Sequence, residues 1–424
     1  MANQEHLALI EQGSAVWNKW YNKNRRVIPN LAKANLSGLN LTGINLKKAD
    51  LTDANLSYTN LTKSQLVNAN LKGANFLEAN LEDANLRGAN LDYVIFARAK
   101  LNAKTIMALK SRHVYDIVNG LVEDKNFNGI DLRNTNLFSV DLSHADLSNA
   151  KLRNANLTSA NLSHAYLFKA DLNQANLQNA DLRNAYLSQA NLSYVYLNGA
   201  LCCGTYFKNA ELKFANLNQA QFSRKTMIDL KWYSVWEIVN HGAVRKNLSG
   251  IDLSHANLQG ADLSEANLTN SNLSHSILRY AKLDRANLTN TDLAGANVKG
   301  VDLEQANLKG TKLKSIVGRE LNTRSSIEQS SPTASSNVMV KERPTTIQVA
   351  TQTSSPTSEL SLDKDRDKPK KRTNILGLLL LAILASIVAG CYTFVSQDPS
   401  FYWQKFLEKA QPWKSKVEQL IPLN

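Results

Sequence analysis

Two pairs of histidines stand at a spacing that could bring their side chains together. His144 and His164 lie 20 residues apart, and His255 and His275 share that interval. Two imidazoles can contribute to a metal site, but a stable zinc site needs four ligands, or three and a water. The sequence places no third ligand beside either pair. We therefore expect no bound metal at these histidines.

Aromatic residues offer a second kind of chemistry, the binding of a protein partner. Tyr166, Tyr186 and Tyr206 also recur every 20 residues, and exposed tyrosine is enriched at protein interfaces. With His144 and His164 beside them, they form a candidate partner-binding strip. The alternative is that the tyrosines stabilise neighbouring parts of the fold by packing on one another.

Motifs for catalysis are missing from the sequence. Cys202, Cys203 and Cys391 have neither metal-ligand nor redox spacing. The chain contains no phosphate-binding glycine loop, no HExxH helix, no nucleophile elbow and no paired-carboxylate pattern. The sequence therefore predicts a protein that is not an enzyme and that needs no cofactor.

These residues belong to a five-residue sequence repeat, A-(N/D)-L-x-x, which runs through most of the first 315 residues. The fold of this repeat must position them. On an α-helix, residues five apart point about 140° away from each other, and on a strand an odd period sends successive leucines to opposite faces. One arrangement keeps every leucine inside: the chain turns a corner at each repeat and coils on itself. Each coil then buries its apolar side chains against its neighbours, as in a β-solenoid.

The five-residue repeat falls into three blocks, each in its own phase. With i as the central apolar residue, i runs from Leu31 to Leu101, from Leu132 to Phe222 and from Leu253 to Leu313, which makes 15, 19 and 13 units. Position i−2 is mostly Ala, which fits an inward corner, and Asn or Asp at i−1 suits a turn. The predicted core is a file of leucines and alanines with little room for a catalytic cavity.

These repeats resemble the pentapeptide repeat family over roughly residues 30–315. The resemblance implies a right-handed quadrilateral β-helix with four repeats in each coil. On that geometry Tyr166, Tyr186 and Tyr206, all at i−1, would stack as a ladder on one edge of the solenoid. The predicted fold class is therefore β, a solenoid with small helical caps and inserts and a C-terminal transmembrane helix.

Two segments that interrupt the five-residue repeat are related to each other in sequence. The segment from Asn102 to Leu132 aligns without a gap with the segment from Ser223 to Leu253. Apolar residues at helical spacing predict an amphipathic helix of about four turns in each insert, with Thr105 and Thr226 as N-caps. The helix residues of the first insert are Ile106, Leu109, His113, Ile117 and Leu121, and residues common to both inserts include Val114/Val235, Ile117/Ile238 and Asn119/Asn240.

The inserts have two possible roles. Each helix is either a lid over the apolar end of a coil stack, because solenoids need their ends covered, or a docking knob. The knob would present Trp232, Tyr233 and Trp236 to a partner. Trp232 and Trp236 are therefore added to the candidate partner-binding residues.

The composition changes at both ends of the repeats. Residues 1–30 carry an apolar stripe that predicts a helical cap, and no cleavable secretory signal is visible. Residues 315–373 are rich in Ser, Thr and Pro and then basic, which predicts a disordered linker. Residues 375–395 carry no charge and would span about 32 Å as a helix, enough for a hydrocarbon core of about 30 Å.

The sequence thus predicts nine segments. They are a cap over residues 1–30, repeat blocks over 31–101, 131–222 and 251–314, inserts over 102–130 and 223–250, a linker over 315–373, a transmembrane helix over 374–395 and an amphipathic tail over 396–424. Basic residues just before the transmembrane helix place the repeats in the cytoplasm by the positive-inside rule. The tail is expected to lie in the lipid interface or to pack on another helix.

Charge decides between two function classes. The net charge is +13, and residues 31–314 carry 31 Lys and Arg against 24 Asp and Glu. Some pentapeptide repeat proteins mimic DNA and regulate type II topoisomerases, which requires an acidic rod, so this alternative is disfavoured. No dense basic stripe interleaved with aromatics points to nucleic acid. The predicted function is a membrane-anchored, non-enzymatic scaffold that binds a protein partner at the cytoplasmic face of a bacterial membrane.

Overall fold

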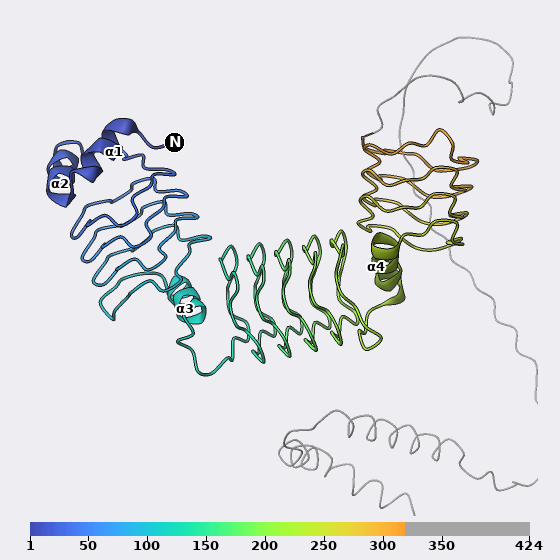
Figure 1. The fold of residues 1–424 in the computed structure, drawn as a ribbon, viewed down its shortest axis with the longest axis horizontal. Helices are drawn as coiled ribbons and strands as arrows, with labels where there is room; N and C mark the ends of the chain where they lie inside the picture. Colours follow the sequence, from blue (N-terminus) through green and yellow to red (C-terminus); the bar gives the residue numbers. More distant parts are fainter. Residues whose placement is uncertain (319–424) are drawn as a thin grey trace, which may run out of the picture. The chain divides into compact units, whose positions relative to one another are not determined.

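The computed structural model describes residues 1–318, which belong to one compact unit. Figure 1 shows the chain winding into successive coils, with helices placed along it. Within the described residues the helices are α1 (Gln4–Glu11), α2 (Ser14–Lys23), α3 (Leu109–Val118) and α4 (Leu230–His241). The coils are built from short bridges and turns, as a β-solenoid requires.

Each coil takes four repeats, because residues four repeats apart pair in parallel bridges. Asn30 pairs with Asp50, Asp50 with Asn70, and Asn70 with Asn90. Hydrogen bonds join the coils on both sides of these i−1 residues. The N–H of Leu31 donates to the carbonyl of Asp50 (2.7 Å), and the N–H of Asp50 donates to the carbonyl of Pro29 (2.8 Å). The next coil thereby satisfies backbone groups that an isolated coil would leave unpaired.

A tight turn makes each corner of the coil. The N–H of Ala34 donates to the carbonyl of Leu31 (3.0 Å), and Lys33 between them has a φ of 61°. A positive φ at the third turn residue is the type II pattern. It carries a steric cost for a residue other than glycine. The N–H of Lys33 also donates to Thr52 of the next coil (2.8 Å), and this bond offsets part of that cost.

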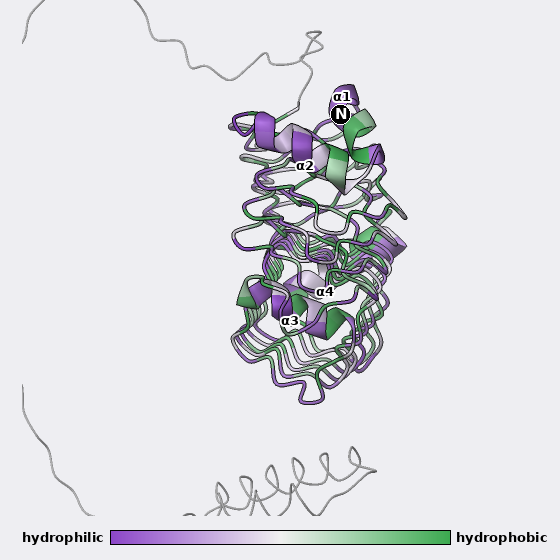
Figure 2. Ribbon diagram, turned by 90° about the vertical axis from the view of Figure 1, so that its left-hand side faces the viewer, coloured by the Kyte–Doolittle hydropathy of each residue, from purple (hydrophilic) through white to green (hydrophobic). Residues whose placement is uncertain are grey.

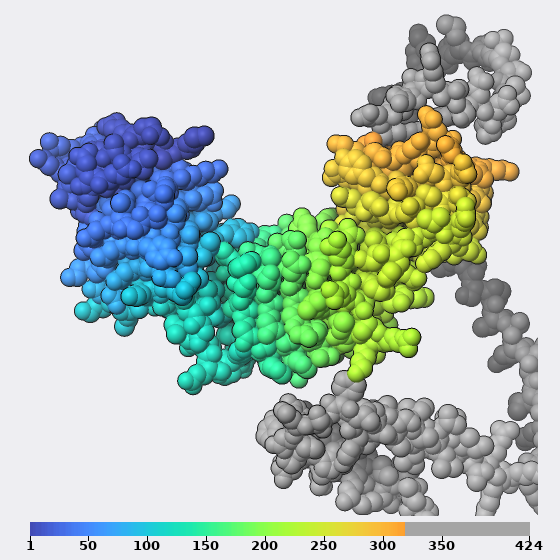
Figure 3. Space-filling view, viewed as in Figure 1, coloured from blue at the N-terminus to red at the C-terminus, as the bar shows by residue number. Residues whose placement is uncertain are grey.

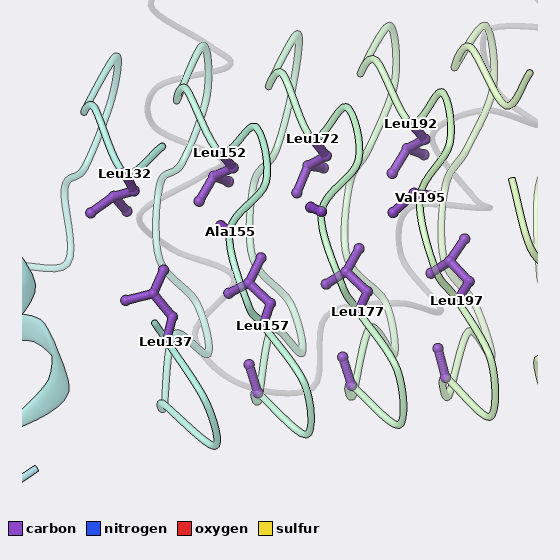
Figure 4. Close-up of a cluster of buried hydrophobic side chains, with 14 of the residues drawn as sticks. Leu132, Leu137, Leu152, Ala155, Leu157, Leu172, Leu177, Leu192, Val195 and Leu197 are labelled. Atoms are coloured by element: carbon purple, nitrogen blue, oxygen red, sulfur yellow. The ribbon is translucent and has the colours of Figure 1, made fainter. Parts of the chain in front are cut away.

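Leucines fill the inside of the coils in continuous files. Figure 4 shows two files of the second block, and every labelled leucine in them is fully buried. The first file contains Leu132, Leu152, Leu172 and Leu192, and the second contains Leu137, Leu157, Leu177 and Leu197. Hydrophilic and hydrophobic residues alternate along the chain (Figure 2). Burying one leucine stabilises the fold by about 1.5–3 kcal/mol, so the files are the main source of stability.

The coils extend further toward the inserts than the sequence predicted. Asn126 pairs with Asp146, and Asn247 pairs with Asn267, so blocks two and three begin before residues 131 and 251. The sequence pattern did not reveal these first repeats, because Lys125 and Lys246 occupy the i−2 position where Ala is usual. Their amines reach outward, to Asp141 (3.0 Å) and Glu237 (3.1 Å) respectively.

Helices α1 and α2 pack on the first coils through buried aromatic residues. Trp17 is fully buried, and its Nε1 donates to the carbonyl of Asn45 (2.7 Å). The hydroxyl of Tyr21 donates to the carbonyl of Lys47 (3.1 Å). Asn3 caps α1 by accepting from the N–H of His6 (3.0 Å). The apolar stripe of residues 1–30 thus faces the end of the leucine files.

The predicted N-caps of the insert helices were wrong. The helices start later, with Ala108 and Asp229 as N-caps, and α3 ends at Val118. Thr105 and Thr226 instead continue the last coil of the block before them. Their hydroxyls donate to the carbonyls of Leu81 (2.9 Å) and Cys202 (2.8 Å). In the first insert, the outer members of the predicted stripe, Ile106 and Leu121, are 52% and 59% exposed.

The solenoid runs to the end of the described region, where Asn297 pairs with Val317. None of the helices in residues 1–318 is long and apolar enough to cross a membrane. The predicted transmembrane helix over 374–395 and the amphipathic tail over 396–424 lie outside the described residues, as does the predicted linker beyond residue 318.

Candidate interaction surfaces

The candidate tyrosines occupy one column of coil-to-coil bridges. Tyr166 pairs with Tyr186, and Tyr186 with Tyr206, through the backbone. The rings of Tyr186 and Tyr206 stack, with centroids 4.8 Å apart and planes 12° apart. Within residues 1–318 the ring of Tyr166 stacks on neither of them, and Phe168 contacts Tyr186 instead (6.3 Å). The strip is therefore a column of three exposed or half-buried tyrosines with one stacked pair.

The candidate histidines stack at the corner beside this column. The rings of His144 and His164 are 4.8 Å apart and parallel to within 3°. The Nε2 of His164 lies 3.4 Å from the side-chain amide of Asn184 on the next coil. Within the described residues, no group of three or more His, Cys, Asp or Glu side chains is placed to hold a metal ion. The pair therefore contributes polar and flat aromatic surface to the tyrosine strip.

The candidate tryptophans of α4 face the solenoid more than the solvent. Trp232 is only 8% exposed. Trp236 stacks on Phe222 of the preceding coil, with centroids 4.8 Å apart, and its Nε1 donates to the carbonyl of Ala220 (2.7 Å). Tyr233 is the exposed member of the three, at 41%. This packing favours the lid over the docking knob.

A shared asparagine joins each insert helix to the coil before it. The side chain of Asn119 accepts from the N–H of Arg98 (2.7 Å) and donates to the carbonyl of Phe96 (3.1 Å). Likewise, the side chain of Asn240 accepts from the N–H of Gln219 (2.5 Å) and donates to the carbonyl of Leu217 (3.0 Å). In a regular coil, the carbonyl of the next coil accepts from this N–H. The side-chain oxygen of the asparagine therefore takes the place of that missing backbone carbonyl.

One column of corners runs unbroken through both inserts. The N–H of Tyr93 donates to the carbonyl of Asn134, and the N–H of Phe214 donates to that of His255, both at 2.8 Å. Between the two members of each pair, the chain leaves the column, forms the insert and returns. Along this corner column adjacent blocks remain hydrogen-bonded as adjacent coils are.

The corner column carries a second aromatic ladder that sequence reasoning missed. Tyr194 stacks on Phe214 (4.7 Å), Phe214 meets His255 edge to face (5.5 Å), and His255 stacks on His275 (5.1 Å). Burial lowers the pKa of His255 below its ordinary value, and the nearby charges of His275 and Lys231 lower it further. The coil-length spacing of Tyr194 and Phe214 was a usable signal, but the longer step across the insert to His255 concealed the rest.

A surface hollow of about 350 Å³ lies beside the corner column and is lined by Tyr93, Asn154, Gln174, Tyr194, Tyr196 and neighbouring residues. Its lining residues include no carboxylate, amine or imidazole. The space-filling view likewise shows closely packed coils within each block (Figure 3). Phenols and carboxamides can bind a ligand by stacking and hydrogen bonding. They do not supply the matched pKa values that general acid–base catalysis uses.

Sequence profiles describe the same repeats as the structure. A profile described as pentapeptide repeats matches in eight copies, over residues 30–64, 64–102, 126–154, 145–184, 185–224, 247–283 and 278–310. These segments make up more than half of the 424 residues. The chain belongs to the pentapeptide repeat family. Its fold is accordingly the right-handed β-helix that the sequence predicted.

Solved pentapeptide repeat proteins are similar to this chain. HetL, involved in heterocyst differentiation regulation in the cyanobacterium Nostoc, is 25% identical over 69% of this chain and 94% of its own, with a TM-score of 0.16. Rfr23 from the cyanobacterium Cyanothece is 24% identical over 28% and 99%, with a TM-score of 0.16. QnrB1, a plasmid-mediated fluoroquinolone resistance protein, is 20% identical over 46% and 88%, with a TM-score of 0.22. No curated protein matches.

Within this pentapeptide repeat protein, the structure brings together some sequence-predicted residues and separates others. Tyr166, Tyr186 and Tyr206 share a column, and His144 and His164 flank it on the adjoining corner. Trp232 and Trp236 lie on α4, in the insert that follows the second block. The candidates therefore form one exposed strip and one largely packed helix, not a single site.

Proposed function

We propose that this pentapeptide repeat protein is a membrane-anchored, non-enzymatic scaffold. Its solenoid binds a protein partner at the cytoplasmic face of a bacterial membrane. The observation that carries the partner-binding part is the tyrosine strip. Asn or Asp usually fills position i−1 in this chain, yet three successive coils place Tyr there, and Tyr166 and Tyr186 are 53% and 36% exposed. Large aromatic side chains concentrate binding energy at interfaces.

The packing of the coils supports a role in binding over one in catalysis. Leucine and alanine side chains fill the interior, and the polar side chains outside form ladders between coils. Asn156, for example, donates to Asn136 of the previous coil (3.1 Å). Within residues 1–318, such ladders form an open surface, and an open surface does not shield a reaction from water. They do present a regular surface on which a protein can dock.

The membrane-anchored part of the proposal rests on sequence. Residues 375–395 have no charged side chain, and six basic residues, from Lys364 to Arg372, stand just before them. A stretch of that length suits a transmembrane helix, and the basic flank favours the cytoplasmic side for the repeats. Anchoring would hold the solenoid close to the membrane and raise its effective concentration for partners there.

The triple substitution Tyr166→Asn, Tyr186→Asn and Tyr206→Asn tests the partner strip. Asn is the usual residue at i−1, so the backbone should be kept while the aromatic surface is lost. We expect co-purification of membrane-solubilised partners to fall sharply, with little change in melting temperature. Tyr196→Asn is a matched control, because Tyr196 is also at i−1 and 53% exposed but lies in another column.

Other results would contradict the proposal. If the tyrosines only stabilise the coils, stability should fall by roughly 0.2–1 kcal/mol for the stacked pair, and co-purification should be unchanged. If the solubilised protein recovers a topoisomerase or salt-sensitive DNA instead, a regulator of DNA topology becomes the better interpretation.

A further inference from the structure

The N-terminal end of the solenoid carries an exposed basic and apolar loop. After α2 and its C-cap Asn24 come Arg25, Arg26, Val27 and Ile28, which are all exposed. Ile28 is 65% exposed and Val27 is 42% exposed. Large aliphatic side chains in this position gain nothing from the core of the protein. They stand beside two guanidinium groups at the very end of the coil stack.

The loop is held in place from both sides. The N–H of Val27 donates to the carbonyl of Asn24 (2.9 Å), and the N–H of Asn24 donates to that of Trp20 in α2 (3.1 Å). Pro29 is buried, and Asn30 already pairs with Asp50. The exposed side chains are therefore displayed by a fixed backbone.

Positive charge is concentrated around this loop. No Asp or Glu occurs between Gln12 and Ala49, and that stretch contains seven of the basic residues. They are Lys19, Lys23, Arg25, Arg26, Lys33, Lys47 and Lys48. Glu5 and Glu11 of α1, and Asp50 and Asp53 of the next coil, are the closest acidic residues along the chain.

None of these seven basic side chains forms an ion pair within residues 1–318. Every ion pair in that region joins residues from Glu78 onward. The rest of the solenoid thus pairs many of its charges, whereas its N-terminal end leaves them available. An uncompensated cluster of this kind attracts an anionic surface.

The apolar part of the loop decides which anionic surface fits. Nucleic acid would use the basic residues through its phosphates, but Val27 and Ile28 offer nothing to a phosphate backbone. An anionic bilayer uses both: the headgroups attract Lys and Arg, and aliphatic side chains enter the boundary of the acyl chains. Trp20, partly exposed on α2, suits the headgroup level.

We propose that the N-terminal end of this solenoid is a peripheral membrane-binding site for anionic lipid, with Val27 and Ile28 as the inserting residues. Lys19, Lys23, Arg25 and Arg26 hold it at the headgroups. This contact is separate from the tyrosine strip and from the C-terminal segment. It gives the described part of the chain its own affinity for a bilayer.

Depth-dependent quenching on the full chain tests the site. A fluorescent amino acid is placed at Ile28 or, as a control, at Val244, which is 47% exposed and far along the sequence. The protein is reconstituted with phosphatidylcholine vesicles, with or without phosphatidylglycerol, that contain a quencher in the acyl region. We expect quenching at position 28 only when phosphatidylglycerol is present. Both labelled proteins keep the same C-terminal segment, so the presence of an anchor there does not distinguish them.

The substitutions Arg25→Gln and Arg26→Gln together should reduce this quenching roughly tenfold or more at equal lipid, because each basic residue near an anionic surface contributes measurably to binding. Equal quenching at positions 28 and 244, or equal quenching without phosphatidylglycerol, would overturn the proposal. So would a duplex oligonucleotide that binds the wild type and not the Gln variant while no quenching occurs, since the basic cluster would then serve nucleic acid.

Discussion

At the scale of single residues, Asn119 and Asn240 show how the coil stack can be interrupted without leaving backbone groups unpaired. A carboxamide oxygen accepts a hydrogen bond as a peptide carbonyl does, so it can stand in for one carbonyl of the missing coil. Sequence comparison of the two inserts singled these residues out as shared. It could not assign their role, because the N–H groups they satisfy lie 21 residues earlier in the chain.

Replacing Asn119 by Ala should destabilise the solenoid by about 1 kcal/mol or somewhat more. The N–H of Arg98 would lose its partner, while the carbonyl of Phe96 would keep only its bond from the N–H of Ala99 (3.0 Å). A hydrogen bond of this kind contributes about 0.5–1.5 kcal/mol to stability. Denaturant unfolding would measure the loss. Asn198→Ala is the control, because the side chain of Asn198 makes no hydrogen bond within residues 1–318; an equal loss in both variants would contradict the assigned role.

A second residue-scale prediction concerns Asp131. The side-chain hydrogen bond from Arg133 lowers the pKa of Asp131 to about 2. A lowered folded-state pKa stabilises the protein above the unfolded value of about 3.9, and the stabilisation is lost as the pH falls through about 2. The Asp131 side chain is 35% exposed, so solvent screening keeps the contribution below about 1 kcal/mol.

Arg133→Gln should therefore raise the pKa of Asp131 toward its unfolded value, as followed by NMR titration of the carboxyl carbon. Asp181 serves as a control in the same spectrum, because its own hydrogen bond from Arg183 lowers its pKa independently. A pKa of Asp131 that stayed near 2 in the variant would show that the Arg133 side chain does not set it and that the backbone N–H of residue 133 and the charge of Lys110 suffice.

At the scale of elements, the coil is the part of the fold that sequence predicts well. Leucine recurs at i and a small residue at i−2 because the side chains at these two positions fill the narrow core. The repeat pattern therefore predicts the packing directly. The prediction failed where another requirement overrode the pattern. Lys125 and Lys246 broke it at block starts, and Thr105 was interpreted as a helix cap although its hydroxyl bonds a carbonyl 24 residues earlier.

The coil period gives an element-scale prediction. Deleting residues 154–173 removes one whole coil of the second block, so every later residue keeps its position relative to the coil before it. Deleting only Asn154 and Ala155 would move the following leucines out of the core. We expect a cooperative melt and native circular dichroism for the whole-coil deletion and an unfolded or aggregated second block for the shorter one. Equal tolerance of both would contradict the inward-leucine solenoid.

The candidate strip illustrates what a repeat pattern leaves open. The column of Tyr166, Tyr186 and Tyr206 follows from their shared phase, because residues at the same position in successive coils must adjoin. Their ring contacts do not follow, since each Tyr can choose among rotamers. Phe168 takes the place beside Tyr186 that Tyr166 was expected to hold, and no backbone pattern specifies that choice.

At the scale of the whole molecule, the orientation of the proposed anchor decides which compartment the solenoid faces. This orientation depends on the basic residues before residue 375, since the segment after residue 395 has four Lys against three acidic residues. The positive-inside rule counts Lys and Arg near the ends of a transmembrane helix. Six basic residues lie within residues 364–372, whereas the four Lys of the other flank are spread over residues 405–416. The solenoid should therefore be cytoplasmic and residues 396–424 should lie across the membrane.

Protease added to intact cells tests this orientation. A tag at the C-terminus should be removed while the repeats remain whole, because only the residues after the anchor would be reached. A tag at the N-terminus should be cleaved only after the cells are opened, which is the internal control for membrane integrity. Cleavage within residues 315–362 in intact cells would reverse the orientation and place the solenoid outside. The tyrosine strip and the basic N-terminal end would then have to find their partners in that compartment.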